Sequence, residues 1–258
     1  MFHVALLIFC LVLYKLGMTG NISVFVYYLS IFILLLALFL FRVWFRETLK
    51  KNHKKVNTLY LLLIEELNPE KLINNITVFL ESSKMFTDAT THGRIALGAG
   101  YSDAGDFNKA LKTYEEILNQ LKNITIRQRK WLMKEVYFSL AKLYIYNSDL
   151  EKGLNYYRLS NAIKLPNFEE KYQVSINQLE ATIDLLENRT NESLTKFLRF
   201  LSEAESEYRK VNVHFQLAQV YEKLSDIEKQ KEHLHYVVEN GNKLHIATQA
   251  REILASLG

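Results

Sequence analysis

The feature that most constrains this chain is a run of 20 residues, Ile22 to Phe41, that carries no charge. Fifteen of these residues are Leu, Ile, Phe or Val. As an α-helix the run would be about 30 Å long, which matches the hydrocarbon core of a bilayer. A buried core helix is the alternative, but the run is too long for one and is apolar on every face. The run therefore predicts a transmembrane helix.

A shorter apolar stretch, Val4 to Tyr14, precedes this run and is bounded by His3 and Lys15. Residues 17–21 separate the two stretches and contain two glycines and an asparagine, which is typical of a tight turn. We expect a transmembrane helical hairpin over residues 1–46. Two alternatives remain open. One is a single span with an interfacial segment, and the other is a cleaved signal peptide, although the expected basic start and small-residue cleavage site are missing.

Basic residues gather directly after the apolar run. Residues 42–55 carry a net charge of +5, whereas residues 56–258 carry −2, within an overall charge of +4. A basic segment beside a span marks the cytosolic side, so we expect residues 56–258 in the cytosol of a protein that crosses the cell membrane twice. The basic residues at the membrane interface are Arg42, Arg46, Lys50, Lys51, Lys54 and Lys55.

The part of this cluster at residues 47–55 is expected to form a basic juxtamembrane segment. It would attract anionic lipid, or it would act only as a stop-transfer signal. The nearly neutral remainder of the chain gives no support for a nucleic-acid partner, which usually requires a basic face.

Chain breakers are scarce. There are 9 glycines and 2 prolines among 258 residues, too few for the turns of a fold with many short strands. Long helices joined by short turns, and therefore an all-α fold, are expected. The single cysteine, Cys10, excludes an internal disulfide and a zinc site built on cysteines.

Four turn-like segments divide the region that follows residue 56. Three share the pattern small–Asp–apolar–polar–polar, around Asp106, Asp149 and Asp226, and the fourth places Asn68 before Pro69. An Asp or Asn at such a position caps the next helix by accepting an N–H from its first turn. Pro69 is favoured in a first helical turn, so each segment predicts a helix start.

The sequences around the three Asp turns are also alike. Leu-(Gly/Ala)-x-x-Tyr precedes each turn, and in two copies a small residue follows it with a Tyr four positions later. This pattern resembles the tetratricopeptide repeat, in which the small residues let two helices approach closely and the large residues fill the gap above them. The residues that carry the resemblance are Leu97, Gly98, Tyr101, Ala110 and Tyr114 in the first copy, Leu140, Ala141, Tyr144, Gly153 and Tyr157 in the second, and Leu217, Ala218, Tyr221 and Leu234 in the third.

The resemblance implies a helical-repeat domain over residues 56–258, arranged as a tetratricopeptide-like α-solenoid. Within it we expect a degenerate repeat from Tyr172 to Tyr208 and a divergent helix pair over residues 56–83. Lys243 to Leu257 is expected to form a final amphipathic helix, which would cover the apolar face of the last repeat.

The chain departs from the family pattern in two ways. The usual Trp early in the first helix is replaced by Arg94, Tyr137 and His214, and the small residue that opens the second helix is Gln230 in the last copy. The spacing between copies also exceeds the usual 34 residues. A variant α-solenoid of similar shape is therefore the alternative.

No catalytic pattern is recognisable, because the chain contains no P-loop, G-x-S-x-G or H-E-x-x-H motif. His233 and His235 are two residues apart, so on a helix they point to different sides, and we expect both on a solvated face. We predict no cofactor, no metal site and no enzymatic activity.

The resemblance implies a concave groove lined by the first helix of each repeat, which commonly binds peptides or helices. The candidate groove residues are Ile95, Glu135, Phe138, Lys142, Phe215 and Gln219. The alternative is that Phe138 and Phe215 pack against neighbouring repeats. The clamp with which chaperone-binding members hold a C-terminal carboxylate is not expected here, because Ile95 and Ala99 occupy the corresponding positions.

The function expected from these features is that of a membrane-anchored scaffold or adaptor. It would bind a protein or peptide partner on the cytosolic face and contact the bilayer through residues 1–46. Anchoring would raise its effective concentration toward other membrane proteins. The alternative is a peptide-binding sensor or regulator that relays to a membrane partner. The sequence does not predict an oligomeric state.

Overall fold

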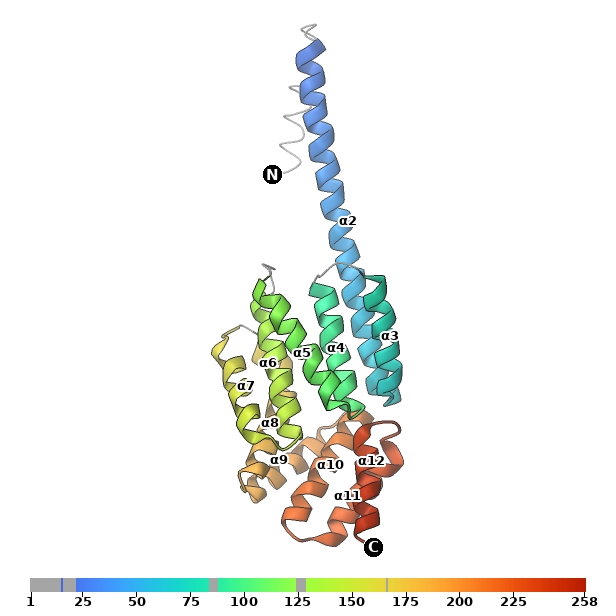
Figure 1. The fold of residues 1–258 in the computed structure, drawn as a ribbon, viewed down its shortest axis with the longest axis vertical. Coiled ribbons are helices and arrows are strands. Elements are labelled where there is room, and N and C mark those ends of the chain that lie inside the picture. Colours follow the sequence, from blue (N-terminus) through green and yellow to red (C-terminus); the bar gives the residue numbers. More distant parts are fainter. Residues whose placement is uncertain (1–14, 16–21, 84–87, 124–128, 166) are drawn as a thin grey trace. The chain divides into compact units, whose positions relative to one another are not determined.

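The computed structural model describes residues 15, 22–83, 88–123, 129–165 and 167–258 (Figure 1). Every regular element in these ranges is an α-helix, which confirms the all-α class. The chain divides into two units, Met1–Asn52 and His53–Gly258, and each is described by itself. The helices are α2 (Ile22–Glu66), α3 (Pro69–Ser82), α4 (Asp88–Asp103), α5 (Phe107–Asn123), α6 (Arg129–Tyr146), α7 (Leu150–Ala162), α8 (Phe168–Leu186), α9 (Thr190–Ser202), α10 (Glu207–Lys223), α11 (Ile227–Asn240) and α12 (His245–Ser256).

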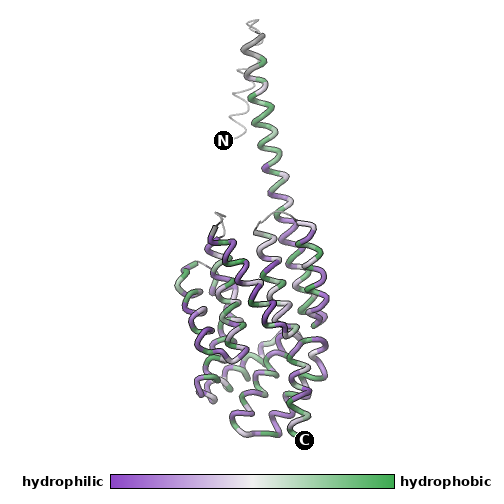
Figure 2. Tube along the Cα trace, in the orientation of Figure 1, coloured by the Kyte–Doolittle hydropathy of each residue, from purple (hydrophilic) through white to green (hydrophobic). Residues whose placement is uncertain are grey.

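Helix α2 begins in the first unit and ends in the second. Among the described residues it supplies the one helix that is long and apolar enough to cross a membrane, over Tyr28–Glu66, and none of its most apolar window is buried. Figure 2 shows the run of hydrophobic residues along its first half. The basic segment at residues 47–55 continues the same helix without a break. The predicted first span and the turn after it lie outside the described residues.

In the second unit the helices form closely packed pairs, namely α4–α5, α6–α7, α8–α9 and α10–α11. The helices that open the first three of these pairs also contact one another in order, α4 with α6 and α6 with α8. One helix of each of these pairs therefore belongs to a common layer, and the candidate site lies on this layer.

In three of the pairs, α4–α5, α6–α7 and α10–α11, the two helices are joined by turns of the same construction. The N–H of Asp106 donates to the carbonyl of Tyr101 at 2.8 Å, and Asp149 and Asp226 repeat this bond to Tyr144 and Tyr221 at 2.9 and 3.0 Å. The residue before each Asp is left-handed, with φ of 81°, 62° and 58° at Gly105, Ser148 and Ser225. A left-handed residue after a helix satisfies its last carbonyls and reverses the chain.

The predicted caps are confirmed. A carboxylate oxygen of Asp106, Asp149 or Asp226 accepts the N–H three residues later at 3.1–3.2 Å. Asn68 does the same for Lys71 at 3.2 Å, directly before Pro69 in the first turn of α3. These side chains satisfy N–H groups that would otherwise have no partner within the helix.

Small residues let the paired helices approach closely. A Cβ atom on Gly98 of α4 would lie 2.6 Å from the Tyr114 ring of α5, and one on Gly153 of α7 would lie 2.3 Å from the Ile145 side chain of α6. Both distances are below van der Waals contact. The closeness of these two pairs therefore depends on glycine.

The α8–α9 pair differs from the other pairs at two equivalent positions. Asp184 stands where the other pairs have Tyr, and its buried carboxylate forms ion pairs with Arg189 and Lys196. Ser193 stands where the other pairs have Ala110 or Gly153, and its hydroxyl donates to the carbonyl of Ala181 at 2.9 Å. The pair keeps the fold of its neighbours with polar contacts in their place.

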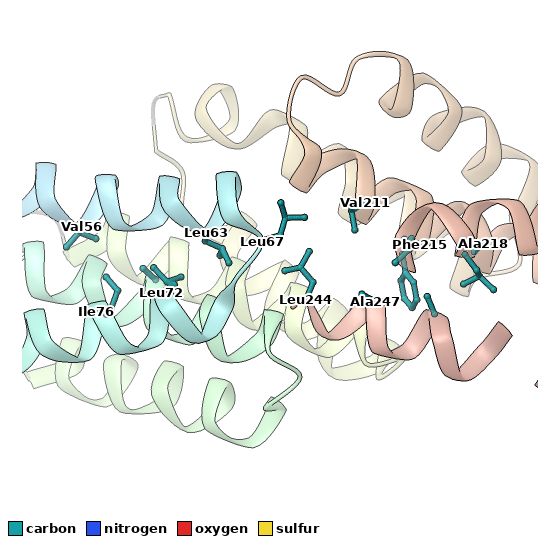
Figure 3. Packing of buried hydrophobic residues seen from close by; sticks show 14 of the residues in the cluster. Val56, Leu63, Leu67, Leu72, Ile76, Val211, Phe215, Ala218, Leu244 and Ala247 are labelled. Atoms are coloured by element: carbon teal, nitrogen blue, oxygen red, sulfur yellow. The ribbon is translucent and has the colours of Figure 1, made fainter. Parts of the chain in front are cut away.

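The last helices return to the first ones within the second unit. The Asn242 side chain donates to the carbonyl of Glu66 at 2.7 Å, and the Lys243 N–H donates to that of Leu67 at 3.2 Å. Beneath these bonds, one apolar cluster joins Leu63 and Leu67 to Val211, Phe215, Leu244 and Ala247 (Figure 3). The predicted final helix, α12, covers this cluster.

Candidate functional site

A cleft of about 530 Å³ opens on the layer of first helices in the second unit. Its lining residues come from four helices: His53 and Asn57 from α2, His92 from α4, Trp131 from α6 and Lys171 from α8. The cleft is shallow and largely open to solvent. The cleft therefore depends on several helix pairs being stacked together.

Trp131, which lines the cleft, belongs to a cluster of aromatic rings. Trp131 meets Phe168 edge-on with ring centroids 5.3 Å apart, and Phe168 stacks on Tyr172 at 4.5 Å. The ammonium of Lys171 lies over two of these rings, 5.3 Å from the centre of Trp131 and 4.9 Å from that of Tyr172. This geometry places a cation against aromatic faces, an arrangement that is itself attractive.

A carboxylate lies beside the cleft. Glu135 of α6 accepts a hydrogen bond from the Tyr172 hydroxyl at 2.6 Å, and its other oxygen is 3.5 Å from His92 Nε2. That other oxygen is buried and accepts no hydrogen bond. The His92 ring meets His53 edge-on at 5.1 Å. Burial, followed by the charge of Glu135, raises the pKa of Tyr172 well above its usual value, so this hydroxyl stays a donor.

A second polar contact connects α4 to α10. The Tyr208 hydroxyl donates to Asp103 at 2.9 Å. Burial raises the pKa of Asp103 to about 6, although the Tyr208 hydrogen bond and the Lys142 charge oppose the shift. Burial lowers the pKa of Lys142. Asp103, Lys142 and Tyr208 are each half-buried.

The prediction that His233 lies on a solvated face is wrong. Its side chain is 8% exposed, and its Nδ1 lies 2.8 Å from Nδ1 of His214 on the adjacent helix. The His214 ring stacks on Tyr236 at 3.7 Å. Burial, with the second imidazole, lowers the pKa of His214 to about 4. The two histidines therefore belong to the α10–α11 interface, whereas His235 is exposed.

The candidate groove residues have different surroundings. Ile95 is buried with Leu132 and Tyr144, and Phe138 is buried against Phe168 and Tyr172. Phe215 is buried in the cluster that α12 covers. The alternative interpretation, packing against neighbouring helices, describes both phenylalanine rings.

The polar members of that set lie elsewhere on the layer. Glu135 lies beside the cleft, and the Lys142 ammonium lies 5.8 Å from the centre of the Tyr146 ring. Gln219 is partly exposed on α10. The structure therefore brings Glu135 and Phe138 together around Tyr172 and leaves the candidates on α10 apart from them.

Of the five residues that line the cleft, the repeat register places His92 in the predicted groove, and sequence reasoning missed the other four: His53, Asn57, Trp131 and Lys171. Trp131 lies one turn before Glu135 on the same face of α6, so extending the groove stripe by four residues would have found it. His53 and Asn57 are also four residues apart. His53 lies in the basic segment and Asn57 lies two residues after it, so neither belongs to the repeats from which the groove was predicted.

The predicted membrane-interface residues Arg42, Arg46, Lys50, Lys51, Lys54 and Lys55 are all exposed on α2. Lys50 pairs with Glu47 at 2.7 Å, and Lys55 lies 5.5 Å from the centre of the Phe79 ring. The three lysines that follow a helix cap, Lys109, Lys152 and Lys229, pair with the capping Asp.

Across the described ranges, no group of three or more His, Cys, Asp or Glu side chains is placed to hold a metal ion. The cleft combines an aromatic ring, a cation and hydrogen-bonding side chains, which is the chemistry of recognition. No protein-family model, curated protein or solved structure matches this chain.

Proposed function

We propose that this protein is a membrane-anchored helical-repeat adaptor that binds a protein or peptide partner on the cytosolic side. In this proposal the second unit is a tetratricopeptide-like α-solenoid, and an N-terminal hairpin anchors it in the membrane. The observation that carries the proposal is the cleft shared by α2, α4, α6 and α8, because a surface built from successive helix pairs is how solenoids bind their partners.

The binding part of the proposal is tested with a photo-crosslinking amino acid in the full chain, in native membranes. The probe is placed at Asn57 in the cleft and, as a matched control, at Lys112 on the exposed side of α5. We expect a discrete crosslinked product from the Asn57 probe and none of that mass from the Lys112 probe. Identical product patterns from the two positions would contradict an adaptor role for the cleft.

The anchor is tested with a membrane-impermeant thiol reagent on intact cells. Cys10 is first replaced by Ser, and single cysteines are then placed at His3, Thr19 or Lys112. A hairpin with a cytosolic repeat unit leaves Thr19→Cys labelled and the other two protected. Labelling of His3→Cys as well would replace the hairpin with a single span, and labelling of Lys112→Cys would reverse the orientation.

A sensor or regulator is the second candidate function. The observation in its favour is that His53 and Asn57, which line the cleft, belong to the same uninterrupted helix as the apolar run. A ligand in the cleft would thus contact the membrane helix itself. A sensor predicts that the ligand changes protease protection of residues 42–50, which do not line the cleft, whereas a plain adaptor predicts no change there.

A further inference from the structure

We infer that the cleft recognises an acidic side chain of its peptide partner, with a neighbouring apolar side chain packed on Trp131. This inference rests on the proposed function and names the chemistry of the ligand. It starts from the charge of Lys171 and from the balance of hydrogen-bond donors and acceptors around it.

The Lys171 ammonium is the one lysine charge that the cleft presents to solvent. No described carboxylate forms an ion pair with it, and its contacts are the rings of Trp131 and Tyr172. Lys171 thus provides a held cation, and an incoming carboxylate would complete the ion pair.

The aromatic cluster around Trp131 does not favour a cationic ligand. A cation would be attracted to the exposed faces of Trp131 and Tyr172, but the protein's own ammonium already lies over both rings. The closest carboxylate, Glu135, accepts a hydrogen bond from Tyr172 and lies 3.5 Å from His92. A cationic ligand would therefore meet like charge at the rings, and the Glu135 oxygen that accepts no hydrogen bond is buried.

The other lining groups suit a peptide. The Asn57 amide can both donate to and accept from a peptide bond, and the Trp131 indole N–H is a further donor. With a single lysine rather than a cluster of them, the cleft matches one carboxylate beside an apolar group better than a multiply charged phosphate. The volume of about 530 Å³ admits a few side chains.

The experiment uses the full chain in nanodiscs of zwitterionic phosphatidylcholine and a display library of random octapeptides with blocked ends. We expect selected peptides to carry Asp or Glu next to an apolar or aromatic residue. Synthetic versions of these peptides should bind at least about tenfold more tightly than counterparts with Asn or Gln in place of the acid.

Variants of the protein then locate the contact. Lys171→Gln should abolish the preference for the acidic peptide over its neutral counterpart, Lys171→Arg should restore most of it, and Lys112→Gln should leave it unchanged. An unchanged melting temperature in Lys171→Gln separates lost recognition from lost folding, because this side chain is exposed.

Each outcome has one meaning. Selected peptides that compete for the Asn57 crosslink but show no preference for acid would overturn this inference and leave the adaptor proposal standing. A library that yields no binder would overturn both. Binding of phosphatidylserine nanodiscs that depends on Lys171, without peptide binding, would assign the cleft to lipid and overturn the inference.

Discussion

Helices α6 and α10 of the second unit each carry a phenylalanine at the same position relative to the turn that follows, but the two rings have different neighbours. Phe138 on α6 and Phe215 on α10 each lie six residues before the Tyr that begins a turn. Around Phe138 lie the rings of Phe168 and Tyr172, which belong to the same aromatic cluster as Trp131 of the cleft. Phe215 instead belongs to an apolar cluster with Leu244 and Ala247.

The difference lies in the size of the side chains on the next helix of the layer. Ala247 and Ala250 of α12 are fully buried, and α12 packs chiefly on α11, within the apolar cluster that also contains Phe215 (Figure 3). Trp131 and Tyr172 stand between α6 and α8 as large rings. Large rings therefore surround Phe138, whereas small side chains of α12 belong to the cluster around Phe215.

Truncating either phenylalanine should cause the largest change. Phe138→Ala and Phe215→Ala each remove a buried ring, and each should lower the free energy of unfolding by about 3–5 kcal/mol, measured by urea denaturation. Leu198→Ala, at an exposed apolar site, is the control and should have little effect. A cost below about 1 kcal/mol for Phe138 alone would show that it belongs to the open surface after all.

Enlarging α12 should break the comparison directly. Ala247→Leu adds volume at a fully buried position, and it should cost about 1–3 kcal/mol by forcing α12 away from the helices on which it packs. Ala255→Leu on the exposed side of α12 provides the matched control. Equal stability of the two variants would mean that the cluster around Phe215 has room for a larger side chain on α12.

Asp103 on α4 should make the protein less stable as the pH rises. The folded chain holds the Asp103 proton up to about pH 6, whereas the ordinary value is 3.8, so the free energy of unfolding falls between about pH 4 and pH 6. Asp103→Asn keeps an acceptor for Tyr208 and removes the buried charge, so it should stabilise the protein at pH 7.5 by roughly 2 kcal/mol. The gain should vanish below pH 4, and a gain independent of pH would contradict this explanation.

His214 on α10 should make the protein less stable as the pH falls, which is the opposite dependence. The pKa of His214 is lowered from 6.5 to about 4, so the unfolded chain binds the proton first and stability falls as the pH drops through this window. His214→Gln should remove about 1–2 kcal/mol of this loss, so the melting temperatures of the variant and the wild type should converge or cross as the pH is lowered. A constant difference in melting temperature from pH 7 to pH 4 would show that His214 does not titrate in this way.

Removing a helix cap should have the smallest effect, and the effect should be the same at the starts of α7 and α11. Asp149→Ala and Asp226→Ala each remove one helix cap with the same 3.2 Å geometry, and each should lower the melting temperature by roughly 2–4 °C. A clear difference between them would show that the two turns are less alike than their hydrogen bonds indicate.

The sequence by itself determined the local features. Asp106, Asp149 and Asp226 cap helices because a carboxylate needs only the next three residues to find its N–H. Short-range steric and hydrogen-bonding rules likewise determine the start of α3 at Pro69 and the turns within the pairs. They also determine the all-α class and the apolar length of α2.

The tertiary structure alone decided the site. Lys171 is exposed in a helix whose local sequence gives no sign of Trp131, and the two meet because α6 and α8 are neighbours in the layer. His233 is buried because α10 presents His214 to it, and Phe215 is covered because α12 returns to the first helices. Such contacts join residues that are far apart in the chain, and helical periodicity shows which face a residue lies on but not what packs against that face.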